Sequence, residues 1–224
     1  MRRGKDKQYF PVRFRLGGGG WMDENVAMRL LTLHIQEPIP GRVLPLMARD
    51  HGPDEAARRY RAIVVTMLRQ LRGLAATRLR ILPDPEDAAE AIRFWLLPRL
   101  AGSWQVAGTV FHADGWEIDF GDDSATILVE ASGEVLCPFL GARWVHTAML
   151  GLERGTHRVR GPASNGGDYF RARPAGDVGL LEDLEERLLP ELPVIHNDNH
   201  WNEALDSLLG PTLKRAWEEE GGGK

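Results

Sequence analysis

The chain has 224 residues, of which 43% are hydrophobic and 27% are charged, and this is enough apolar material for one sizeable core. Its one cysteine, Cys137, cannot form an intramolecular disulfide, as is usual in a reducing compartment. The net charge of −4 gives no global attraction for nucleic acid. No apolar run approaches the roughly 20 residues that a membrane span needs. We therefore expect a cytoplasmic protein with no membrane or nucleic-acid partner. Its oligomeric state is left open.

The two ends differ from the middle in composition. Six Arg or Lys residues and one Asp lie in the first sixteen positions, ahead of the glycine run Gly17–Gly20. We interpret residues 1–27 as a basic, flexible extension, either a solvated tail or an arm that binds phosphate. Residues 218–224 are acidic and glycine-rich and are interpreted as a tail. Residues 28–217 are left as a single domain.

The first half of this domain alternates strand and helix. Arg29–Ile35 is a short apolar run typical of a strand, and Pro53 opens a helix whose apolar stripe continues to Gly73. Arg78–Leu82 resembles a second strand. Asp84 and Pro85 then have the pattern of a helix N-cap and first turn, and the helix is expected to stop at Pro98. Such alternation predicts parallel strands with right-handed crossovers.

The second half continues this pattern with less regularity. An Asp-Gly turn predicts a hairpin, later runs predict strands and helices, and a glycine-rich loop separates two short strands. The expected elements are strands at 106–111, 116–120, 126–129, 157–160 and 168–173, the loop Gly161–Gly167, and helices at 144–152, 180–189 and 201–209, the last broken at Gly210-Pro211.

Four segments, in this order, resemble motifs of small bacterial glycosyltransferase-like proteins of the nucleotide-diphospho-sugar transferase superfamily. Gln36–Val43 is similar to their Pro-x-Pro-Gly-Arg-x-Lys-Thr-Arg-Leu loop, and Val129–Pro138 to their Gly-Ser-Asp-Cys-Pro segment. Val159–Phe170 resembles Leu-Gly-Pro-Ala-x-Asp-Gly-Gly-Tyr-Tyr, and Glu191–Asp198 resembles a late strand before an Asp-rich turn. The resemblance covers roughly Arg29 to Leu209.

This resemblance implies an α/β fold of the GT-A type, a three-layer α/β/α sandwich with a mixed, mainly parallel sheet. It further implies that a nucleotide diphosphate or nucleotide-sugar binds at the carboxyl ends of the strands, together with Mg²⁺ or Mn²⁺. The residues that match are Gly41, Arg42, Gly166 and Gly167 for phosphate, and Glu134, Asn165 and Asp198 for the metal.

The motifs depart from the family pattern at polar positions. Val43–Leu46 stands where the family carries Lys, Thr and Arg, and Asn165 replaces an aspartate. The strand-end aspartate has no clean equivalent, although Glu134 or Glu130 could substitute for it. A catalytically inactive relative that serves as a binding or scaffolding protein is therefore an alternative.

A polar cluster near the end of the chain gives a second alternative. His196, Asp198 and His200 could bind a metal, or this turn could simply cap the following helix through Asp198 or Asn199. Cys137, which precedes a proline, is expected to be a buried structural residue. Trp201 and Trp116 border polar loops and are the candidates for stacking on a sugar, although core packing is the first explanation for the tryptophans.

Overall fold

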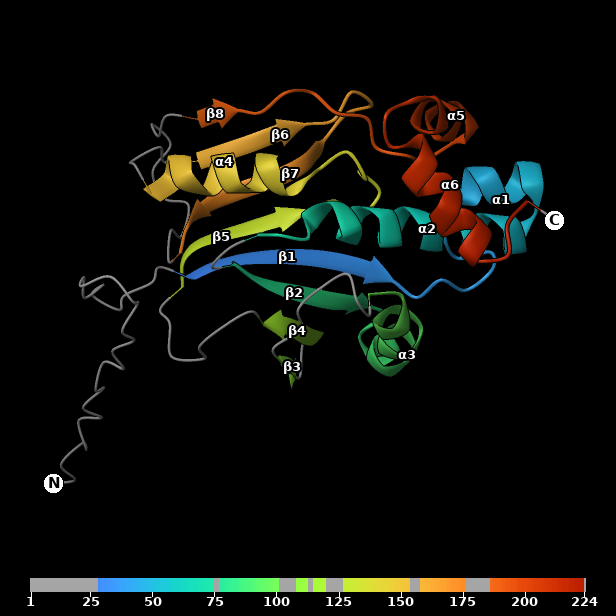
Figure 1. Cartoon of the computed structure of the whole chain (residues 1–224), viewed down its shortest axis with the longest axis horizontal. Coiled ribbons are helices and arrows are strands. Elements are labelled where there is room, and N and C mark those ends of the chain that lie inside the picture. Colours follow the sequence, from blue (N-terminus) through green and yellow to red (C-terminus); the bar gives the residue numbers. More distant parts are fainter. Residues whose placement is uncertain are drawn as a thin grey trace, which may run out of the picture.

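The computed structural model describes residues 28–74, 77–100, 108–112, 115–119, 127–153, 158–175 and 186–223 (Figure 1). The predicted basic extension, residues 1–27, lies outside these ranges. The elements are β1 (Met28–Gln36), α1 (Pro45–His51), α2 (Pro53–Leu71), β2 (Thr77–Asp84), the 3-10 turn η1 (Glu86–Ala88), α3 (Ala89–Leu100), β3 (Gly108–His112), β4 (Gly115–Asp119), β5 (Ile127–Gly133), α4 (Ala142–Glu153), β6 (Arg158–Pro162), β7 (Asp168–Pro174), β8 (Glu186–Leu188), α5 (Asp198–Asp206) and α6 (Gly210–Glu219).

The described strands form one sheet in the order β3-β4-β2-β1-β5-β7-β6-β8. The central strand β1 is parallel to both β2 and β5, and β6 is parallel to β8. β4 and β7 run antiparallel to their neighbours. The prediction of an α/β fold with a mixed sheet is confirmed, although only three of the seven described strand pairings are parallel.

The two faces of the sheet differ, and β1 shows this most directly. Leu31, Leu33 and Ile35 have no exposed surface, whereas His34 and Gln36, which alternate with them, are exposed. This two-residue period is expected of a strand with only one face buried. The buried face packs on α2, whose own apolar stripe supplies eleven buried residues. The core therefore lies between the sheet and α2.

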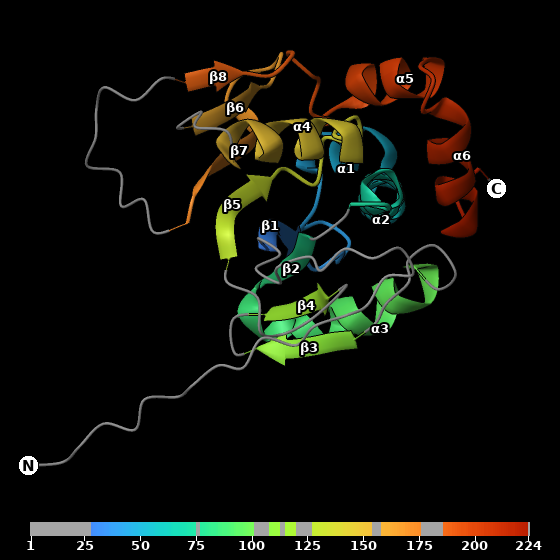
Figure 2. The same cartoon turned by 60° about the vertical axis from the view of Figure 1, so that its left-hand side comes forward.

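A second helix, α4, covers the same face. Arg29 on β1 is buried, and its guanidinium donates to both carboxylate oxygens of Glu153 at 2.8 and 3.0 Å and lies 2.9 Å from His146. Both partners lie on α4. Figure 2 shows the helices gathered on one side of the sheet. They form a helical layer on this face of the sheet.

Several element boundaries differ from the prediction. Asp84 ends β2 and is not a helix cap, and α3 continues past Pro98 to Leu100. A proline removes one intrahelical hydrogen bond, which a helix can tolerate when it ends two residues later. Glu186–Leu188 was predicted to be helical but forms the fully exposed edge strand β8, while 180–185 lie outside the described residues.

Near the end of the chain, Gly210 and Pro211 begin α6 where a helix break was predicted. Proline is favoured in the first turn of a helix because its missing N–H has no partner there in any case. α6 continues to Glu219, inside the expected tail. Glu219 forms an ion pair with Arg69 at 2.7 Å, and Glu220 forms one with Arg99. These pairs attach the end of the chain to α2 and α3.

Candidate functional site

Three strand ends meet at the carboxyl edge of the sheet, where β1 ends at Gln36, β2 at Asp84 and β5 at Gly133. The backbone N–H of Gln36 donates to the buried Tyr60 hydroxyl at 2.8 Å, and the Gln36 amide donates to Asp84 at 3.1 Å. Burial raises the pKa of the Tyr60 phenol, and the charges of Glu134 and Asp84 raise it further. The end of β1 therefore contacts one buried hydroxyl, and acids at the ends of β2 and β5 lie within electrostatic range of it. The sequence did not reveal Tyr60 because it lies within the apolar stripe of α2.

The loop after β1 contains the two predicted phosphate residues Gly41 and Arg42. Gly41 has φ +85° and no atom within 4 Å of the position where a Cβ would stand, so its backbone is open to solvent. Arg42 donates its backbone N–H to Ile39 at 3.0 Å. Its side chain is exposed and makes no ion pair with another described residue. An exposed cation therefore lies beside an accessible backbone turn.

The next residues of this loop are core residues. Val43 is fully buried, and Leu44 is 4% exposed with φ +46°, a left-handed conformation that is rare for a branched side chain. Leu44 is the N-cap of α1, and Pro45 starts that helix. The family pattern has a lysine where Leu44 stands. This chain uses the position for packing.

The glycine turn between β6 and β7 lies at the same edge, because β6 is antiparallel to β7, which in turn is antiparallel to β5. Gly166 and Gly167 have φ of +95° and +80°, and no atom lies within 4 Å of either Cβ position. The Asn165 amide donates to the Val194 carbonyl at 3.0 Å. Asn165 thus braces the turn, and its exposed side-chain oxygen is left without a described hydrogen-bond donor.

Glu134 follows β5 directly and lies beside this turn. Its backbone N–H donates to the Tyr169 carbonyl at 2.8 Å, and its carboxylate accepts from the Leu136 N–H at 3.1 Å. Desolvation lowers the pKa of the nearby His196 imidazole, the Glu134 charge raises it, and His200 lowers it. An acid and two imidazoles therefore lie within electrostatic range of one another.

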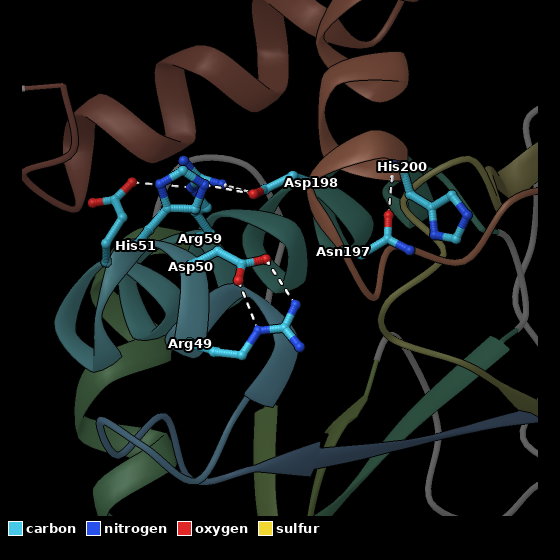
Figure 3. Close-up of polar contacts among 8 residues, drawn as sticks. Arg49, Asp50, His51, Arg59, Asn197, Asp198 and His200 are labelled. Carbon is cyan, nitrogen blue, oxygen red and sulfur yellow. Dashed lines mark hydrogen bonds and ion pairs between the residues drawn. The ribbon is translucent and has the colours of Figure 1, made fainter.

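Asp198, the third predicted metal ligand, is engaged in ion pairs. One carboxylate oxygen lies 2.6 Å from Arg59 of α2, and the other lies 2.6 Å from His51 of α1 (Figure 3). Among the residues that the structure describes, no three His, Cys, Asp or Glu side chains gather closely enough to hold a metal ion. Metal binding by Glu134, Asn165 and Asp198, or by His196, Asp198 and His200, stays a prediction.

The cap of α5 is Asn197, which the sequence reading missed in favour of Asp198 or Asn199. The Asn197 side chain accepts from the His200 N–H at 3.1 Å, and its φ of −146° is extended, as helix caps require (Figure 3). All the residues of this turn are Asn, Asp or His, so composition could not single out the cap.

Two other sequence candidates are core residues. Cys137 is fully buried, and burial raises the pKa of its thiol to about 12, which keeps it protonated and unreactive. Trp201 is 2% exposed, and its ring packs edge-on against the Trp217 ring with 6.0 Å between the ring centroids. It therefore offers no ring face to a sugar. The side chain of Trp116 lies outside the described residues.

Comparison with known proteins gives evidence on the fold. No protein-family profile matches the chain, and no curated protein sequence matches it. Its structure is similar to a solved structure from Desulfovibrio desulfuricans G20 named "putative nucleotide-diphospho-sugar transferase", with a TM-score of 0.57 and 18% identity over 87% of this chain and 98% of that one. Within the described residues, no helix is both long and apolar enough to cross a bilayer. The structural similarity shows that the chain has the α/β fold of a nucleotide-diphospho-sugar transferase.

Proposed function

We propose that this chain is a glycosyltransferase-like protein that binds a nucleotide diphosphate or nucleotide-sugar at the carboxyl edge of its sheet. The observation that carries the proposal is the position of the Gly41-Arg42 loop and of the Gly166-Gly167 turn on this one edge. In open α/β sheets, ligands bind outside the carboxyl ends of the strands. The fold similarity described above supports the same region.

The two segments would contribute differently to a diphosphate. The glycine turn would offer backbone N–H groups, because Gly166 and Gly167 have no side chain to keep a phosphate away. Arg42 would add a guanidinium, which forms charge-assisted, often bidentate hydrogen bonds to phosphate. Glu134 and Asn165 would supply oxygen atoms for Mg²⁺ or Mn²⁺, which is proposed here as an accessory ligand.

Calorimetric titration of the full chain with UDP, GDP, CDP and their sugars, with and without Mg²⁺ or Mn²⁺, tests the proposal. We expect at least one nucleotide to bind, and Arg42→Ala to weaken it about tenfold, or about 1.4 kcal/mol. Arg49→Ala is the matched control, since Arg49 is exposed on the adjacent α1 and pairs only with its neighbour Asp50 among described residues.

Two results would contradict the proposal. One is the absence of heat with every nucleotide in the panel, in a sample whose unfolding transition shows that it is folded. The other is an equal loss of affinity in Arg42→Ala and Arg49→Ala, because a general charge effect would then explain the binding without a site at the loop.

A second candidate function is an inactive relative that binds a ligand or partner without turnover. Two observations favour it: Leu44 is buried where the family has a lysine, and both oxygens of Asp198 are held by Arg59 and His51. We expect no release of nucleoside diphosphate from any bound nucleotide-sugar. Release that is lost in Glu134→Ala would rule this candidate out and assign Glu134 a part in the reaction.

A further inference from the structure

The face of the sheet opposite the described helices α2 and α4 carries a transverse row of polar side chains. In register, Arg80 of β2 pairs with Thr32 of β1, Thr32 with Ser132 of β5, Ser132 with Arg171 of β7, and Arg171 with Arg160 of β6. Residues directly opposite on paired strands point to the same face. This row, named here the arginine row, therefore has arginines at its ends and two small hydroxyl side chains in its middle.

The arginine row forms the floor and wall of a cavity of about 710 Å³. Five arginines and three carboxylates are among its lining residues, an excess of two positive charges in a chain whose net charge is −4. The arginines are Arg80, Arg158, Arg160, Arg171 and Arg173. Positive charge is therefore concentrated at this face against the overall sign of the molecule.

One wall of the cavity is held together by a buried carboxylate. Arg160 and Arg171 stand directly opposite each other, which by itself is unfavourable for two like charges. Asp168, whose side chain is 8% exposed, lies 3.0 Å from Arg160 and 2.6 Å from Arg171. Arg160 also lies 3.8 Å from Glu186 of β8, so Arg171 has only the carboxylate that it shares with Arg160. Arg171, with 72% of its side chain exposed, remains accessible to a further anion.

The middle of the floor offers two hydrogen-bond donors. The hydroxyls of Thr32 and Ser132 make no hydrogen bond to another described residue, and Ser132 is exposed. At about 4.8 Å between strands, the Cα atoms of Arg80 and Arg171 are about 14 Å apart across this floor. A compact anion can therefore contact the hydroxyls and lie between cationic side walls.

We propose that this face binds a compact anion with two or more linked phosphate groups, held over Thr32 and Ser132 and against Arg171. The cavity volume falls in the range of about 300–1,000 Å³ that is usual for small-molecule sites. No aromatic side chain is among its described lining residues, so the stacking that single-stranded nucleic acids use is missing there. The site is distinct from the carboxyl-edge loop that contains Arg42.

Calorimetry of the full chain with inorganic pyrophosphate and tripolyphosphate tests this site. We expect one binding event that weakens as salt is added, because exposed charges are screened. Ser132→Glu, which puts a carboxylate in the middle of the floor, and Arg171→Gln should each weaken binding by about tenfold or more, or about 1.4 kcal/mol. Orthophosphate, with one phosphate group, should bind more weakly than pyrophosphate.

The controls separate this site from the rest of the surface. Asn202→Glu adds the same charge at an exposed position of α5 and should leave binding unchanged, as should Arg49→Ala on α1. Thermal unfolding checks that each variant is folded. If Ser132→Glu does not fold, the test rests on Arg171→Gln. Unchanged affinity in Arg171→Gln, an equal loss of affinity in Arg49→Ala, or binding of single-stranded RNA without binding of pyrophosphate would each overturn the proposal.

Discussion

Asp198→Asn tests whether this carboxylate is a structural group. The substitution keeps the shape of the side chain but removes the charge that Arg59 and His51 share. Arg59 is 11% exposed, and its guanidinium also contacts Glu55 at 3.1 Å and lies 5.2 Å from the centre of the Trp201 ring. It therefore cannot turn out to water without disturbing the contact between α2 and α5.

The size of the effect follows from these contacts. A hydrogen bond between charged groups contributes about 1.5–3 kcal/mol, and a neutral one about 0.5–1.5 kcal/mol. Replacing the charged hydrogen bond at Arg59 by a neutral one costs about 1–1.5 kcal/mol. Loss of the ion pair with the exposed His51 costs up to about 1 kcal/mol more. We expect the free energy of unfolding to fall by about 2 kcal/mol, and Tm by about 4–8 °C for a chain of this size.

Urea unfolding followed by tryptophan fluorescence measures this loss, with an unchanged dependence on urea showing that the unfolded state is not altered. Asp50→Asn is the control, because Asp50 is an exposed acid of the same region and pairs with Arg49 (Figure 3). It should leave the midpoint unchanged. An Asp198→Asn variant that is as stable as the parent, yet loses a bound divalent cation, would refute the structural role and favour the metal-ligand prediction.

Three further predictions concern single residues. Gly161→Ala should destabilise the fold by about 1–3 kcal/mol in thermal unfolding, because the new Cβ would meet the Tyr169 ring at 2.5 Å, and no loss would mean that the ring is free to move. Asn197→Ala should cost about 1 kcal/mol in the same assay by removing the cap on the His200 N–H, whereas Asn197→Asp should largely restore it. The Cys137 thiol, with its pKa raised to about 12, should not react with a thiol reagent at pH 8 until the protein unfolds, and fast labelling of the folded chain would contradict its burial.

The parts of the fold that the sequence predicted are those with a strong period. The alternation in β1 and the apolar stripe of α2 come from burial on one face, which dictates the residue type at every second or every third and fourth position. The hairpin of β3 and β4 was found from its Asp-Gly turn. These signals are local, so they remain visible without knowledge of the tertiary structure.

The missed elements lack such local signals. α1 has seven residues, too few for a period to show, and β8 has three exposed residues and pairs with β6 at the edge of the sheet. The role of Asp198 was missed for a related reason. Its partners Arg59 and His51 are 139 and 147 positions away in the chain, and only the packing of α1 and α2 against α5 brings them together.

The helix α1 and the role of Asp198, both missed from the sequence, are connected by one change in the loop after β1. Where the family pattern has Lys and Arg, this chain has Leu44 and Leu46; Val43 and Leu44 are buried, and Pro45 starts α1. α1 in turn carries His51, which holds one oxygen of Asp198. The same stretch thus removes two potential phosphate ligands and occupies an acid, so Arg42 remains as its exposed cation. Any diphosphate at this edge must therefore depend on Arg42 and on the backbone of the glycine turn, and its affinity should depend on Arg42 more than on a divalent metal.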